Sequence, residues 1–459
     1  MKNVLFLLAD DQRYNTIHAL GNDGIITPNL DKLAQNGVAF TNAHIMGGTN
    51  GAICMPSRAT FNTGRQLFRL PDEGQAIACE HITIGQAFKN AGYNTCGIGK
   101  WHNGTESYAR SFTDGANIFF GGMWDHWNVP VCDYHPDGVY DRYINYTPNF
   151  FFDNKSTRWN CDRINAGVHS TELMAGAAVD YINAYDGENP FYMYVAFLAP
   201  HDPRTMPEKF RNMYNKDDIA LPPNFIERHP IDFGIEQLRD EVLANYPRGE
   251  DEIRQHIADY YGMISHIDDA VGRIIQALDD KGELDNTIIV FAADNGLAIG
   301  SHGLMGKQNL YEESVRVPLI ISGCDIPKGG VTDKYAYLFD LYPTLCNLCG
   351  VDVPGSVETV DLSPVIFNGA SVRDEMYLAY ADSVRGIKSG DYKLIEYRTA
   401  DISATQLFNL ADDPYELNSI DDENIIAQMR ERMYYYRDLY GDAEHRVGKQ
   451  FWKHSMLSI

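Results

Sequence analysis

The sequence has no apolar run long enough to cross a membrane, since nothing in its 459 residues approaches the roughly 20 consecutive apolar residues that a span requires. The start suggests a leader only weakly, because the apolar run 4–9 is short and ends in Asp10-Asp11, where a cleavage site would have small residues. We interpret this run as the first strand. We expect no membrane partner and a cytoplasmic protein, or a secreted or periplasmic one if a signal peptide has been removed.

Positive charge is also scarce: 38 Lys and Arg against 63 Asp and Glu give a formal net charge of −25 at pH 7. A chain with this balance cannot neutralise rows of phosphates, which argues against nucleic acid as a partner. If the substrate is an anion, the positive field that binds it must be local. A metal ion and a few well-placed cations would have to supply it.

The cysteines show no dense spacing that would indicate a disulfide framework. The eight are Cys54, Cys79, Cys96, Cys132, Cys161, Cys324, Cys346 and Cys349. Cys346-x-x-Cys349 resembles a redox or metal pair, but no second pair accompanies it. It follows apolar residues at helical spacing, which favours core packing.

Short apolar runs alternate with helical patterns, which is typical of an α/β fold. The expected strands are 4–9, 94–98, 191–199 and 287–293, and the expected helices are 29–36, 84–90, 170–185 and 252–280. The strands are apolar throughout, which predicts a large, mainly parallel sheet flanked by helices. After about residue 365, short antiparallel strands (376–381, 385–387, 392–397, 406–410) precede a helix over 423–440. We therefore predict a catalytic domain over 1–365 and a smaller α+β domain over 366–459.

Each expected strand of the large sheet ends in side chains that are costly to bury. These are Asp10-Asp11, Lys100 with His102, His201-Asp202, and Asp294-Asn295. Any one of these groups is ordinary in a turn. Ligands of α/β sheets bind at the carboxyl ends of the strands, so the presence of all four polar groups at those ends predicts a single site.

The carboxylates in this group indicate a metal. Two carboxylates about 4 Å apart repel by roughly 4 kcal/mol at an effective dielectric constant near 20, and Asp294 adds to the repulsion. Asp and Asn provide only hard oxygen ligands, which favours calcium or magnesium over zinc. Calcium is preferred, because it accepts six to eight ligands in loose geometry.

The segment 54–65 contains the candidate nucleophile. Pro56 and Ser57 mark the start of a helix, so Cys54 is expected just before its N-terminus, where backbone N–H groups favour an anion. Arg58 adds a fixed positive charge one turn later. The alternative is a buried, inert cysteine.

Cys54-x-Pro56-Ser57-Arg58, followed by Thr63-Gly64-Arg65, resembles the signature of the formylglycine-dependent (type I) sulfatases of the alkaline phosphatase superfamily. Six further segments resemble family motifs in the right order: 8–11, 99–102, 199–201, 293–296, 302–307, and 407–410 with 413–416. The resemblance spans nearly the whole chain. It implies hydrolysis of a sulfate ester after a formylglycine-generating enzyme has oxidised Cys54 to formylglycine.

The resemblance also implies roles for the candidate residues. Calcium would be held by residue 54 together with Asp10, Asp11, Asp294 and Asn295. Lys100 and Lys307 would hold sulfate oxygens, and Arg58 would steady the modified residue. His201 would protonate or bind the leaving oxygen, and His102 would take the proton of the second hydroxyl of the formylglycine hydrate. These cations would provide the local positive field.

The expected substrate is a sulfated sugar. His302, Arg204, Asp202 and the loop 124–127, which contains two tryptophans, are polar and aromatic candidates for the mouth of the pocket. The loop aromatics are equally compatible with core packing, and Arg204 with a surface ion pair. Two other functions stay open: a phosphonate or phosphodiester hydrolase on the same fold, and a non-catalytic carbohydrate-binding relative. The latter would have lost Cys54 or a metal carboxylate, and this chain keeps them all.

Overall fold

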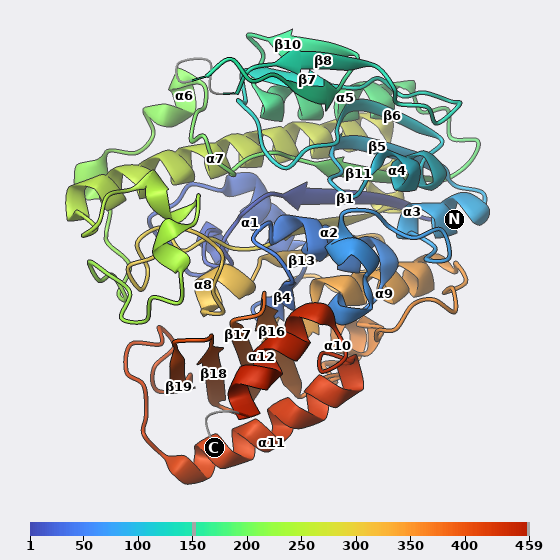
Figure 1. The fold of residues 1–459 in the computed structure, drawn as a ribbon. Coiled ribbons are helices and arrows are strands. Elements are labelled where there is room, and N and C mark those ends of the chain that lie inside the picture. The colour runs from blue at the N-terminus through green and yellow to red at the C-terminus, as the bar shows by residue number, and fades with distance from the viewer. Residues whose placement is uncertain (149–152, 457–459) are drawn as a thin grey trace.

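The computed structural model describes residues 1–148 and 153–456, and a large sheet lies at its centre (Figure 1). In spatial order its strands are β14 (Gly330–Thr332), β2 (Gly37–Phe40), β13 (Leu319–Gly323), β12 (Thr287–Ala293), β1 (Asn3–Ala9), β11 (Phe191–Ala196), β5 (Asn94–Lys100) and β6 (Asp114–Phe119). The strands from β12 to β6 are parallel, and β13 is antiparallel to both of its neighbours. The predicted α/β fold with a mainly parallel sheet is confirmed.

Helices cover both faces of this sheet, which explains why its central strands are apolar throughout. All seven residues of β1 and of β12 are buried. Figure 1 shows α5 (Ser170–Ala184) and α7 (Glu250–Lys281) on one side of β1, with α2 (Cys54–Thr63) and α9 (Leu341–Cys349) on the other. The remaining helices next to the sheet are α1 (Pro28–Gln35), α3 (Ile84–Asn90) and α4 (Thr105–Ser111).

A second sheet lies below the first in Figure 1. Its order is β19 (Ser403–Asn409), β18 (Tyr392–Arg398), β17 (Val384–Ser389), β16 (Glu375–Tyr380) and β4 (Gly47–Gly48), and α11 (Glu423–Tyr440) and α12 (Arg446–Met456) accompany it. The four C-terminal strands are antiparallel, as predicted, whereas β4 comes from the N-terminal part of the chain and pairs in parallel with β16. The domain boundary at residue 365 stays a prediction.

Two differences from the predicted element boundaries concern segments that carry candidate site residues. β11 ends at Ala196, three residues before the predicted end, although the apolar run continues to Ala199. Helix α2 begins at Cys54, not after it, because Ile53 already has helical dihedrals (φ −52°, ψ −39°) and its carbonyl accepts a hydrogen bond from Ser57 N at 3.2 Å. Cys54 is therefore part of the first helical turn.

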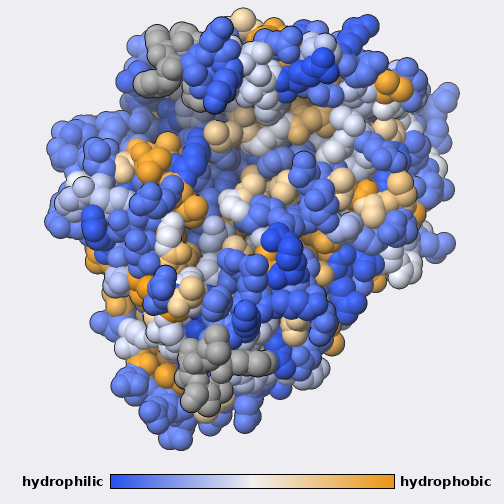
Figure 2. Space-filling model, viewed as in Figure 1, coloured by the Kyte–Doolittle hydropathy of each residue, from blue (hydrophilic) through white to orange (hydrophobic). Residues whose placement is uncertain are grey.

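The visible face is largely hydrophilic, with hydrophobic residues in small separate patches (Figure 2). Of the helices within residues 1–148 and 153–456, none has the length and apolar character that crossing a bilayer requires.

Candidate active site

The carboxyl ends of β1, β11 and β12 bring the predicted site residues together. The backbone N–H of Asp10 donates to Ala199 O at 3.1 Å, and that of Asp294 donates to Ala9 O at 3.2 Å. These bonds hold the three segments that follow the strands at one edge of the sheet. Asp10, Asp294 and Asn295 are fully buried there.

The carboxylate cluster has free oxygen atoms suited to a cation. Asp11 N donates to Asp294 Oδ1 at 3.1 Å, and Asn295 Nδ2 donates to Asp11 Oδ1 at 2.7 Å. Within the described part of the chain, Asp10 Oδ1 and Asn295 Oδ1 are buried without a hydrogen-bond partner. Ligand atoms of Asp10, Cys54 and Asp294 lie within 4.8 Å of one another. Because buried oxygens without partners are costly, this donor set fits a hard cation such as calcium.

The pKa values of the aspartates reflect their crowding. Burial, reinforced by the charge of Asp294, raises the pKa of Asp10 to about 7, although Lys100 acts in the opposite direction. Burial acts on Asp11 too, but His201 and Lys307 outweigh it and lower the pKa of this carboxyl. A bound cation would favour the ionised form of all three aspartates.

Cys54 lies beside the aspartate cluster and is only 3% exposed. Its Sγ is 3.5 Å from Lys100 Nζ and 3.6 Å from His102 Nδ1. Burial raises the pKa of the Cys54 thiol in spite of the two nearby lysines. Since the thiolate is the reactive form of cysteine, an unmodified Cys54 is a poor nucleophile.

Two lysines supply buried positive charge on either side of the aspartates. Lys100 Nζ, from the end of β5, contacts Asp10 Oδ2, and Lys307 Nζ contacts Asp11 Oδ1. Burial opposes the charged form, but Asp11 raises the pKa of Lys307 well above its ordinary value, and Asp10 raises that of Lys100. Both groups are therefore ammonium ions, available to bind an anion.

Arg58 holds the site together from the second turn of α2. Its Nε donates to Asp294 Oδ2 at 2.7 Å, and its Nη1 donates to the carbonyl of Lys100 at 2.7 Å. The guanidinium is fully buried. Arg58 thus links the helix of Cys54 to the ends of β5 and β12.

The two predicted histidines differ in their surroundings. His201 Nε2 is 3.6 Å from Asp11 Oδ2, and its Nδ1 is 3.0 Å from Asp202 O. Burial and the charge of Lys100 lower the pKa of His102 well below its ordinary value. A neutral His102 is able to accept a proton.

The remaining candidates lie at the edge of this group or away from it. Arg204 is half-buried, and its Nη1 is 2.8 Å from His256 Nδ1. His302 has both ring nitrogens engaged, at 2.7 Å from Glu313 Oε1 and 3.0 Å from the carbonyl of Glu416. Its assignment to substrate stays a prediction, and this arrangement leaves it no free nitrogen.

The aromatic loop divides into two parts. His126 is buried between Ser170 Oγ at 2.7 Å and the carbonyl of His201 at 2.9 Å, so it belongs to the core behind the site. Trp124 is only partly buried and packs on Trp159 of β9 (Thr157–Asn160), with ring centroids 4.7 Å apart. Trp124 and Trp127, both only partly buried, are therefore the residues of this loop that still fit a sugar-binding surface.

Sequence reasoning missed three polar residues around the site. Arg239 donates to Asp202 Oδ1 at 2.8 Å, and Gln308 donates to Asp240 Oδ2 at 2.7 Å. Arg239 and Asp240 lie in an irregular segment without hydrophobic periodicity. The only available signal was the position of Gln308, directly after Lys307.

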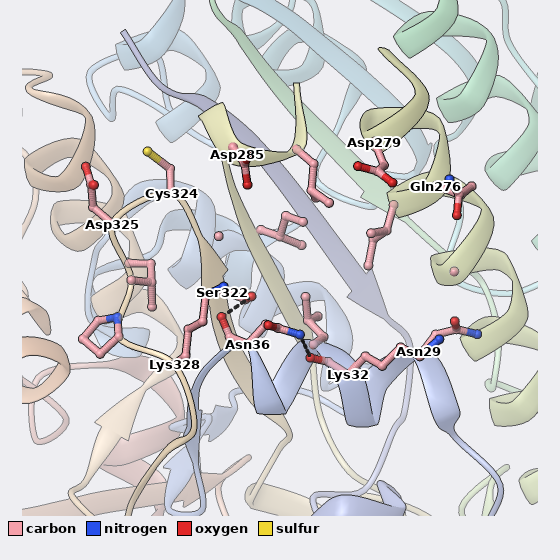
Figure 3. Close-up of a pocket in the computed structure, with 18 residues that line it drawn as sticks. Asn29, Lys32, Asn36, Gln276, Asp279, Asp285, Ser322, Cys324, Asp325 and Lys328 are labelled. Carbon is pink, nitrogen blue, oxygen red and sulfur yellow. Dashed lines mark hydrogen bonds between the residues drawn. The ribbon is translucent and has the colours of Figure 1, made fainter. Parts of the chain in front are cut away.

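A separate cavity of about 650 Å³ lies at the other edge of the sheet. Its lining includes Asp285, just before β12 begins, and Ser322 near the end of the antiparallel β13 (Figure 3). The aspartate cluster follows the opposite end of β12. This cavity therefore has no part in the site.

Two buried lysines opposite a carboxylate cluster are suited to hold a tetrahedral anion. An α/β fold that gathers such groups at the carboxyl edge of its sheet is suited to bind an anionic ester there.

Comparison with known proteins gives the family. The Sulfatase family model matches residues 2–351, and the model of the N-sulphoglucosamine sulphohydrolase C-terminal region matches residues 300–438. The chain therefore belongs to the sulfatase family and is a sulfuric ester hydrolase.

Individual relatives agree with this assignment. The chain is 26% identical to an N-acetylglucosamine-6-O-sulfatase of Bacteroides thetaiotaomicron, over 91% of this chain and 82% of that protein. It is 27% identical to an arylsulfatase of Clostridium perfringens, over 95% of this chain and 93% of that protein. A solved structure, described as a complex with its substrate D-glucosamine-2-N,6-O-disulfate, matches with a TM-score of 0.77 and 22% identity, covering 97% of this chain and 99% of that one.

Proposed function

We propose that this sulfatase hydrolyses a sulfate ester on a sugar, using formylglycine formed from Cys54 and a bound calcium ion. The observation that carries the proposal is the position of Cys54 on the first turn of α2, with its Sγ 3.5 Å from Lys100 Nζ and close to the aspartate cluster. A side chain at this position faces both the cation that would hold the sulfate and the oxygen ligands that would hold the metal.

The absent groups would supply what the unmodified site lacks. Formylglycine hydrate would provide an oxygen nucleophile, and calcium, held by Asp10, Asp11, Asp294 and Asn295, would provide positive charge to activate it. The raised pKa of the Cys54 thiol and the buried oxygens of Asp10 and Asn295 without partners support this need.

The residues of the chain then bind the ester and move its protons. Lys100 and Lys307 bind sulfate oxygens and stabilise the charge that develops on them. His201, beside Asp202, binds or protonates the departing alcohol oxygen. His102, neutral and 3.6 Å from the side chain of residue 54, takes a proton from it so that sulfate can leave.

The sugar assignment is supported by the relatives and by the mouth of the site. One similar protein is named for N-acetylglucosamine 6-sulfate, and one similar structure holds a sulfated glucosamine. The charged pair of Asp202 with Arg239 provides hydrogen-bonding groups of the kind that sugars require, and Gly122, two residues before Trp124, lies beside the His102 ring.

The test joins the mass of the peptide that contains Cys54 to the kinetics of the same sample. We expect formylglycine in protein made with the modifying enzyme, and loss of turnover on chelation that calcium restores. Fully active protein with an intact thiol would contradict the modification. Zinc or a second metal ion on elemental analysis, or a phosphate ester cleaved more efficiently than the matched sulfate ester, would favour the phosphonate or phosphodiester hydrolase.

A further inference from the structure

The segment 235–243 carries charged side chains to the candidate active site. Arg239 Nη1 donates to Asp202 Oδ1 and to Asp240 Oδ1, each at 2.8 Å, and its Nη2 contacts Asp202 Oδ2. Asp202 directly follows His201, the residue assigned to the leaving oxygen. Arg239 is thus bound to the part of the site where the alcohol of the ester departs.

The same segment also reaches the other side of the site. Gln308 Nε2 donates to Asp240 Oδ2 at 2.7 Å and to the carbonyl of Gly51 at 3.0 Å. Gln308 directly follows Lys307, and Gly51 precedes Cys54 by three positions. We call Asp202, Arg239, Asp240 and Gln308 the polar collar, because these four residues connect the segments that carry His201 and Lys307 to the segment that precedes Cys54.

The polar collar extends from the interior to solvent. The side chains of Asp202 and Asp240 are 10% and 11% exposed, whereas that of Arg239 is 41% exposed. Burial acts on both carboxyls, but His201 and Arg239 lower the pKa of Asp202, and Lys307 and Arg239 lower that of Asp240. Both aspartates are therefore charged. A ligand that approaches the collar meets two carboxylates and a guanidinium.

The charges of the collar decide which ligand it suits. Three of the five N–H groups of Arg239 donate to Asp202 and Asp240, so its charge is already offset by two carboxylates, which would repel a substrate carboxylate or a second sulfate. A hydroxyl has no such conflict, because it can donate to a carboxylate and accept from the guanidinium at the same time. The collar therefore suits neighbouring hydroxyl groups and disfavours anionic substituents.

We propose that the polar collar is the subsite for the hydroxyl groups of the sugar ring that bears the scissile sulfate. This inference rests on the proposed function and deepens it, since it assigns the substrate an uncharged, hydroxylated ring edge next to the ester. Arg239 is then a specificity-determining residue that no sequence motif indicates.

The test compares sulfated monosaccharides with analogues in which one hydroxyl beside the ester is replaced by hydrogen. Wild-type enzyme is expected to lose about tenfold or more in kcat/KM for at least one deoxy analogue, as when a buried charged group loses its hydrogen-bond partner. In the Arg239→Gln variant, kcat/KM for the parent sugar is expected to fall to the value for that analogue, so that the two values differ by less than about twofold. Arg239→Lys keeps the positive charge but not the forked donor geometry of the guanidinium, so its kcat/KM for the parent sugar should lie between those of the wild type and Arg239→Gln.

Arg228→Gln is the matched control, because Arg228 lies nearby in the chain, is 58% exposed and pairs with Glu236 at 3.5 Å. It should leave the preference for the hydroxyl unchanged. Equal losses by Arg239→Gln on parent sugar, deoxy analogue and 4-nitrophenyl sulfate would show a merely structural role and overturn the inference alone. If wild-type enzyme cleaves the aryl sulfate but no sulfated sugar, the sugar assignment fails and the inference with it. If it cleaves no sulfate ester, the proposed function itself fails.

Discussion

Lys100 and Lys307 provide the buried positive charge that a chain with a net charge of −25 needs for an anionic substrate. We predict that Lys100→Ala and Lys307→Ala each lower kcat/KM on a sulfate ester by about a hundredfold or more, on the order of 3 kcal/mol, because each removes a preorganised donor to the transition state. Steady-state kinetics on folded protein measures this. Lys449→Ala, with a side chain 60% exposed, is the control. A loss in kcat/KM below about threefold for Lys100→Ala or Lys307→Ala would mean that the substituted lysine does not bind the sulfate.

Gly122 limits the space around His102. A Cβ at this position would lie 3.0 Å from the Cε1 and Nε2 atoms of the His102 ring. Gly122→Ala is therefore expected to shift the imidazole and to lower kcat by about tenfold, because catalysis is sensitive to displacements well below 1 Å. The far-ultraviolet circular dichroism spectrum should not change. Unaltered kcat would mean that His102 adapts without cost or has no part in turnover.

The residues of the site were predictable where a strand or a helix start delivered them. Asp10, Lys100 and Asp294 follow apolar runs, and Cys54 is marked by Pro56 and Ser57. Arg239 and Asp240 were not predictable, since they reach the site only through tertiary hydrogen bonds. His302 shows the converse: the motif around it is present, but its nitrogens bond to Glu313 and to the Glu416 carbonyl.

At the scale of elements, the prediction identified the long apolar strands β1, β5, β11 and β12, but it missed β2 and β13 of the same sheet, although both are largely buried. The runs 4–9 and 287–293 correspond to β1 and β12 because nothing polar interrupts them. The hairpin of β8 (Tyr143–Tyr146) and β9 was missed, since its residues are exposed or half-buried and lack a continuous apolar run. The two-residue β4 was missed for a different reason: it becomes a strand only by pairing with β16, more than 300 residues away.

Helices α5 and α7 offer a matched test of packing. A Cβ at Gly176 in α5 would meet no atom within 4 Å, whereas one at Gly262 in α7 would lie 2.6 Å from Met206 Sδ and 3.0 Å from Phe210 O. Gly176→Ala is expected to stabilise the protein by about 0.5–1 kcal/mol through helix propensity. Gly262→Ala should destabilise it by about 1–3 kcal/mol through overpacking. Urea unfolding measures both, and equal shifts would contradict the packing argument.

At the scale of the molecule, a buried ionic cluster joins the second sheet to the segment that follows Lys307. Lys393 of β18 donates to Glu312 at 3.0 Å and contacts Glu416 at 2.7 Å, and Lys388 of β17 donates to Glu312 at 2.8 Å. All four side chains are nearly inaccessible to solvent. The cluster links the segment that follows Lys307 to the C-terminal strands.

We predict that Lys393→Met destabilises the protein by about 3–5 kcal/mol, because it leaves the carboxylates of Glu312 and Glu416 buried without their shared partner. The midpoint of urea unfolding provides the measurement. Lys449→Met changes an exposed lysine and should stay within about 0.5 kcal/mol of wild type. A similarly small effect of Lys393→Met would mean that solvent reaches the cluster.

The whole molecule should lose stability between pH 7 and pH 5, because several histidines are buried in the neutral form. Burial lowers the pKa of His44, His126 and His229 to about 4 each and that of His169 to about 3, and all four side chains are almost fully buried. In the unfolded chain these groups have pKa values near 6.5. As the pH falls below 6.5, the unfolded state therefore takes up protons that the folded state does not, and stability decreases.

Each of these histidines is expected to lower the free energy of unfolding by about 2 kcal/mol at pH 5 relative to pH 7, since one pKa unit corresponds to about 1.4 kcal/mol. Two carboxyls act in the opposite direction: burial raises the pKa of Asp268 to about 6 and that of Asp10 to about 7, so the contribution of their protonated forms is present below pH 4 and is lost as the pH rises through these values. Four histidines outweigh these two carboxyls, so the free energy of unfolding should fall by several kcal/mol. Urea unfolding at pH 7 and pH 5 tests this. In His229→Gln the free energy of unfolding should depend less steeply on pH, by a slope that corresponds to about one proton fewer taken up on unfolding. An unchanged slope in that variant would mean that the folded state accommodates a charged His229.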